Sequence, residues 1–63
     1  MAEYREAIRL APNFAWPHAN LGLALYLRGD RQTGFNEIRI AHALAPNDPQ
    51  ITALYQRVLS QRR

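Results

Sequence analysis

The chain contains no cysteine. It also contains no lysine, because all eight of its Lys and Arg residues are arginine. Without cysteine, no disulfide can stabilise the fold, and two histidines cannot supply the four Cys and His ligands of a common structural zinc site. A cysteine nucleophile and a Schiff-base lysine are excluded as well. A folded chain of 63 residues buries only roughly 60% of the surface of its unfolded form. We therefore expect one small helical domain without metal, cofactor or small-molecule substrate.

Long apolar runs are also missing. The longest covers residues 21–27, whereas a membrane-spanning helix needs about 20 apolar residues. The first six residues, MAEYRE, are charged and lack the apolar core of a secretory signal. We therefore expect a cytoplasmic protein with no membrane partner.

The positive charge is modest. The formal net charge is +3 and the isoelectric point is near 10.2. The arginines are spread along the chain instead of following one helix that could enter a nucleic-acid groove. We interpret them first as solvated surface, next as contacts for an acidic peptide, and last as contacts for nucleic acid. Arginine without lysine, together with abundant alanine, indicates a GC-rich genome and hence a bacterial source.

An internal repeat spans 34 residues. Segment 3–13 (EYREAIRLAPN) aligns without gaps with segment 37–47 (EIRIAHALAPN), and seven of the eleven positions are identical. Such a fixed period is the signature of stacked helical units. The alignment fades after Asn13 and Asn47, so we expect the end of one unit, a complete unit, and a different final segment.

Proline and glycine mark the ends of four predicted helices, at about 2–10, 15–28, 31–45 and 49–61. Proline is tolerated in the first turn of a helix but not in its interior. Asp48 before Pro49 is a favourable N-cap, and Gly29 before Asp30 indicates a turn. Pro12, Pro17 and Pro46 stand at other predicted helix ends. Because the connections are short, we expect antiparallel neighbours.

This pattern resembles the tetratricopeptide repeat, a helix–turn–helix unit of 34 residues. The family pattern W-x2-L-G-x2-Y…A-x3-F…P falls on His18, Leu21, Gly22, Leu25, Gly34, Ile38 and Pro46. Four positions depart from it, with His18 for tryptophan, Leu25 for tyrosine, Gly34 for alanine and Ile38 for phenylalanine. The resemblance implies an all-α fold of antiparallel helix–turn–helix repeats, an α-solenoid of about four helices. It also implies a non-enzymatic module that binds a protein or peptide.

The resemblance also divides the chain into parts of a single module, 1–63. Residues 1–13 correspond to the second helix of a partial repeat, 14–47 to a complete repeat, and 48–63 to a C-terminal capping helix. The first helix of the partial repeat, which would cover Tyr4, Ala7, Ile8 and Ala11, is not present. We therefore expect a C-terminal piece of a longer repeat protein.

The helix predicted at 15–28 is apolar on both sides, so both sides must be covered or one must bind a partner. The resemblance implies that a partner-binding groove is lined by Trp16, Asn20, Leu23, Tyr26 and Leu27. The same apolar side could also contact a neighbouring repeat, contact a second chain, or form ordinary core. We keep three hypotheses: a peptide-binding module, a structural end-piece that stacks or self-associates, and a basic nucleic-acid-binding module.

No catalytic or metal-binding set is found in the sequence. His18 stands at a packing position of the repeat and is predicted to be a structural histidine, and His42 is predicted to be partly exposed. Asp48 and Asp30 are a predicted cap and a turn residue, so neither is a good acid–base candidate. Some repeats of this family bind a terminal carboxylate, but here Ala19 and Leu23 stand where charged or amide groups would be needed. We therefore expect an apolar or aromatic anchor instead.

Overall fold

The computed structural model describes residues 2–11 and 13–61, and they form four α-helices. Their bounds are α1 Ala2–Leu10, α2 Ala15–Leu27, α3 Arg31–Leu44 and α4 Pro49–Gln61. The predicted helices are confirmed, with α2 and α3 each ending one residue early. No strand occurs within the described ranges. Pro12, where a helix end is predicted, lies outside the described ranges, as do Met1, Arg62 and Arg63.

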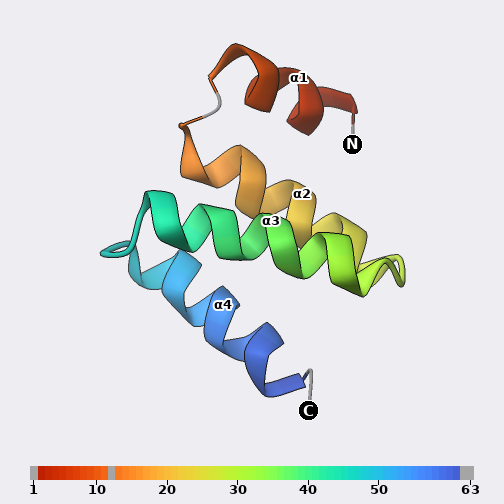
Figure 1. Ribbon diagram of the computed structural model, residues 1–63, viewed down its shortest axis with the longest axis vertical. Coiled ribbons are helices and arrows are strands. Elements are labelled where there is room, and N and C mark those ends of the chain that lie inside the picture. The colour runs from red at the N-terminus through yellow and green to blue at the C-terminus, as the bar shows by residue number, and fades with distance from the viewer. Residues whose placement is uncertain (1, 12, 62–63) are drawn as a thin grey trace.

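The helices follow one another as a stack in chain order (Figure 1). α2 and α3 pack most extensively, while α1 and α4 lie at opposite ends of the stack and contact it less. The molecule is thin, with extents of 34 × 27 × 13 Å. This arrangement confirms the predicted all-α fold of antiparallel helix–turn–helix repeats.

The turn between α2 and α3 depends on Gly29. Its φ is +101°, a left-handed conformation that side chains disfavour. The Asp30 amide donates to the Leu25 carbonyl at 2.9 Å, and the Gly29 amide donates to the Tyr26 carbonyl at 3.1 Å. These two bonds form a Schellman motif, which satisfies carbonyls at the end of α2 and reverses the chain into α3.

Glycine also brings α2 and α3 close together. A Cβ atom on Gly22 would lie 2.6 Å from the Gly34 carbonyl oxygen, and a Cβ on Gly34 would lie 2.6 Å from the Gly22 carbonyl oxygen. Both glycines are buried. The two backbones therefore touch directly, which explains why small residues occupy these positions of the repeat.

Two clusters of the apolar core join α2, α3 and α4. One contains Tyr26, Phe35, Ile38 and Val58. The other contains Ala19, Ala41 and Ile51. Leu54 of α4 packs against both clusters. Residues of α2, α3 and α4 therefore meet in each cluster, with α3 between the other two helices in chain order.

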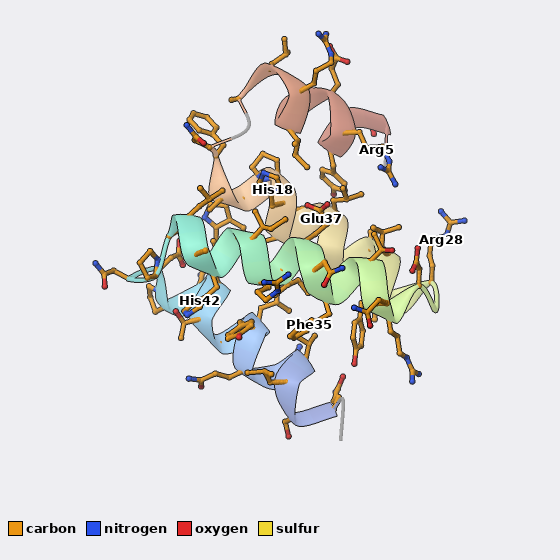
Figure 2. All side chains as sticks on the ribbon, viewed as in Figure 1. Arg5, His18, Arg28, Phe35, Glu37 and His42 are labelled. Carbon is orange, nitrogen blue, oxygen red and sulfur yellow. The ribbon has the colours of Figure 1, made fainter. Side chains whose placement is uncertain are left out.

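An aromatic stack joins α4 to α3, and a side-chain cap begins α4. The Tyr55 ring stacks on His42 of α3 with centroids 4.7 Å apart, and on Phe35 with centroids 5.9 Å apart. Figure 2 shows His42 and Phe35 on the side of α3 that faces α4. Asp48 Oδ1 accepts hydrogen bonds from the amides of Gln50 at 2.9 Å and Ile51 at 3.2 Å. The predicted N-cap is therefore confirmed, as is the partial exposure of His42.

Candidate functional site

The side of α2 opposite its glycine contact is the candidate site. Its neighbours bury His18, Ala19, Leu21, Gly22, Leu25 and Tyr26. Four residues remain at least partly accessible and recur at spacings of four, three and four, so they follow one face of the helix. We call them the α2 stripe: Trp16, Asn20, Leu23 and Leu27.

The α2 stripe exposes apolar side chains on both sides of its one polar residue, Asn20. Trp16 is 41% exposed and Leu27 is 75% exposed. Leu23 is half-buried, and Asn20 is exposed between them. A tryptophan indole supplies a large apolar surface and one hydrogen-bond donor, and the asparagine amide both donates and accepts. The stripe can therefore bind apolar side chains and hold a peptide backbone in register.

Tyr26 is placed differently from the rest. The sequence predicts it on the same exposed surface, but in the structure it is 9% exposed and shares a core cluster with Phe35 and Val58. It is buried in the cluster that residues of α3 and α4 form beside α2. The Arg31 guanidinium carbon lies 5.9 Å from the centroid of the Tyr26 ring. A direct role of Tyr26 in binding stays a prediction, and little of its surface is available to a partner.

α4 adds a second surface that the sequence analysis missed. A hollow of about 290 Å³ is lined by Gln50, Ala53, Leu54 and Arg57. Subtracting the 34-residue period from these positions gives Trp16, Ala19, Asn20 and Leu23, which include three residues of the α2 stripe. The period could have revealed this surface, because it places α2 and α4 in equivalent positions of successive units.

The helices that carry the α4 hollow and the α2 stripe are linked through the core. Ala19 of α2 and Ile51 of α4 share one core cluster, and Tyr26 and Val58 share the other. Val58 follows Arg57 directly along α4, and Leu54 packs on both clusters while lining the hollow. The candidate site therefore has two parts, the α2 stripe and the α4 hollow, which stand at equivalent positions of successive units.

A larger hollow of about 540 Å³ lies on α1, lined by Glu3, Glu6, Ala7 and Leu10. Leu10 is 69% exposed. Four further residues are half-buried: Tyr4, Ala7, Ile8 and Ala11. These are the residues that the sequence predicts a partner helix would cover. α1 therefore has apolar surface that α2 covers only in part.

The histidines are accounted for within the fold. His18 is buried, and its Nδ1 lies 2.8 Å from Glu37 Oε1 across the α2–α3 interface. Figure 2 shows this pair on the side of the α2–α3 hairpin that faces α1. His42 Nδ1 lies 3.4 Å from the Thr52 hydroxyl, beside the stacked ring of Tyr55. The prediction that His18 is a packed, hydrogen-bonded residue is therefore confirmed.

The described part of the chain holds no group of three or more His, Cys, Asp or Glu that could bind a metal ion. None of the helices described is long and apolar enough to cross a membrane.

A family model described as TPR repeat matches residues 1–29, which is just under half of the chain. The matched segment contains α1, α2 and the first part of the turn after α2, including three residues of the Schellman motif. The match supports a tetratricopeptide-type repeat, in agreement with the helical hairpin and its glycine contact. No curated protein matches the chain, and no solved structure matches it either.

Proposed function

We propose that the chain is a protein-interaction module that binds a peptide or a helix of another protein on the α2 stripe and in the α4 hollow. The exposure of Trp16 and Leu27 on a helix whose other face is buried carries this proposal. Tetratricopeptide-type repeats are in general interaction modules, and the family match supports a function of that kind. The proposed role is non-enzymatic, and Tyr26 contributes mainly by supporting the surface.

A peptide library tests this function. The folded chain, immobilised, selects from a library of random peptides displayed on phage, and a Trp16→Ala variant is treated in parallel. We expect the wild type to enrich a family of sequences, and the variant to lose most of that enrichment, because loss of an aromatic hot-spot residue weakens an interface by about 2 kcal/mol or more.

The control is Ile40→Ala on α3. Ile40 is 39% exposed, close to the exposed fraction of Trp16, but it lies outside the candidate site. It should select as the wild type does. Unfolding of the Trp16→Ala variant, followed by circular dichroism, would show that Trp16 is core. Equal enrichment by all three proteins would overturn the proposed site.

A second function is favoured by the apolar hollow on α1. We propose as the alternative that the chain is an end-piece of a longer repeat array, in which a further helix or a second chain covers Ala7 and Leu10. Sedimentation over a wide concentration range tests self-association. A dimer that dissociates in the Leu10→Glu variant supports this role, and a monomer at all concentrations opposes self-association through α1.

We also propose the division of the module into a partial repeat (1–13), a complete repeat (14–47) and a capping helix (48–63). The equivalence of α2 and α4 under the 34-residue period supports it. A cytoplasmic location and a bacterial source stay predictions from the sequence.

A further inference from the structure

We propose that the chain associates head to tail with a second copy of itself, so that the hollow on α1 of one copy packs against the α4 hollow of the next. This inference rests on the second function proposed above, the self-associating end-piece, and it identifies the two surfaces that meet. Charge complementarity carries it, because the α1 hollow is lined by carboxylates and the α4 hollow by a guanidinium.

The two hollows have the same helical pattern. Each is lined by four residues at positions i, i+3, i+4 and i+7, which share one face of a helix over two turns. On α1 these residues are Glu3, Glu6, Ala7 and Leu10. On α4 they are Gln50, Ala53, Leu54 and Arg57. In each set three residues are exposed and one is half-buried, so both faces are accessible to another helix of similar length.

The positions of the charges favour an antiparallel arrangement of the two helices. When the hollows are in register and the helices run in opposite directions, Glu3 lies opposite Arg57. Ala7 then lies opposite Ala53 near the centre, where small side chains allow a short distance between helix axes. In a parallel arrangement Arg57 would lie opposite Leu10, and the opposite charges would not meet.

The charged groups are accessible for this pairing. Arg57 is exposed, and its guanidinium forms no ion pair within the residues that the structure describes. On α1, Glu6 pairs with Arg9 of the same helix, and both of these side chains are more than half exposed. An exposed ion pair of this kind contributes little to stability, so the acidic side of the α1 hollow can reorganise when another helix approaches.

The positions of the two hollows determine the kind of assembly. α1 and α4 lie at opposite ends of the stack of described helices (Figure 1). A contact between two different surfaces leaves one hollow open at each end, so further copies add and open chains form instead of a closed dimer. A contact of two helical turns is small, and we therefore expect weak, concentration-dependent association. The α2 stripe stays exposed in such chains.

Sedimentation equilibrium of charge-reversal variants tests the arrangement. We expect the average mass of the wild type to rise with concentration beyond that of a dimer, and to fall as salt concentration rises. Glu3→Arg and Arg57→Glu should each weaken association by roughly fivefold, because opposite charges are replaced by like charges. An equimolar mixture of the two variants should regain association, since each then meets an opposite charge.

Two further variants serve as controls. Arg39→Glu makes the same charge change at an exposed position of α3 outside both hollows, and it should associate as the wild type does. Ala53→Gln enlarges an exposed side chain at the centre of the α4 hollow without changing charge, and it should also weaken association. Circular dichroism shows whether each variant keeps its helices.

The outcomes separate the head-to-tail contact from the function on which it rests. Association that Glu3→Arg abolishes and Arg57→Glu leaves unchanged would mean that two α1 hollows meet, so a second chain covers α1 but the head-to-tail contact is wrong. A mixture that fails to regain association would also overturn the pairing. A wild type that is monomeric at every concentration would overturn both the contact and the self-associating role.

Discussion

The carbonyl oxygen of Gly34 occupies the space that a Cβ atom on Gly22 would need, at 2.6 Å. Replacing a helical glycine with alanine usually stabilises a helix by about 1 kcal/mol. At Gly22 the new methyl group would meet backbone, which cannot turn aside as a flexible side chain can. The two helices would have to separate.

We therefore expect Gly22→Ala to reverse the usual sign and destabilise the fold by roughly 1–3 kcal/mol, as overpacking does elsewhere. Chemical denaturation followed by circular dichroism measures this change. Gln32→Ala on the exposed side of α3 serves as the control and should change stability little. An increase in stability for Gly22→Ala would show that the α2–α3 contact is looser than described.

The pair of His18 and Glu37 should stabilise the α2–α3 interface only when both side chains are present. Removing either partner leaves a polar group in a largely buried place, which typically costs about 1–3 kcal/mol. We expect His18→Leu and Glu37→Gln each to destabilise the chain, and the double variant to be less destabilised than the sum of the two. A double-mutant cycle gives the coupling free energy, and additive effects would contradict the pair.

Removal of the Tyr55 ring should weaken the packing of α4 on α3 more than the packing of α2 on α3. The ring contacts both His42 and Phe35, and replacing a packed aromatic residue with alanine costs roughly 3 kcal/mol or more. We expect Tyr55→Ala to increase hydrogen exchange of the α4 amides more than that of the α2 and α3 amides. Leu59→Ala, an exposed change on the same helix, is the control. Uniform loss of protection would mean that the helices unfold as one unit.

Two aspartates at helix starts offer a matched comparison. Asp48 accepts two backbone hydrogen bonds at the start of α4, whereas Asp30, at the start of α3, makes no side-chain cap bond. We expect Asp48→Ala to destabilise the chain by about 1 kcal/mol and Asp30→Ala to cost clearly less. Thermal unfolding of both variants provides the test, and equal losses would contradict the capping geometry.

The helices could be predicted from the sequence because their end signals are local. Asp48 before Pro49 and Gly29 before Asp30 act through neighbouring backbone groups, and the structure places helix ends beside both. The buried face of α3 was also predictable, since Gly34, Ile38 and Ala41 recur at helical spacing between polar residues. Repetition of the segment 3–13 at 37–47 supplied the overall architecture.

The surface of α2 could not be predicted in the same way. Apolar residues stand on every side of that helix, so the sequence does not indicate which side is buried. Burial there is decided by long-range packing, since Tyr26 shares a core cluster with Val58, 32 positions away in sequence. The hollow around Arg57 lies along α4, and only the 34-residue period relates it to the α2 stripe.

The stacking of helices in chain order has a consequence for folding kinetics. Each helix packs mainly on the helix next to it in sequence, so most loops that must close are short and cost little entropy. Small helical proteins dominated by such local contacts fold in microseconds to milliseconds. The α2–α3 hairpin, with its direct backbone contact, is the natural nucleus, and α1 and α4 can then add to it independently from either side.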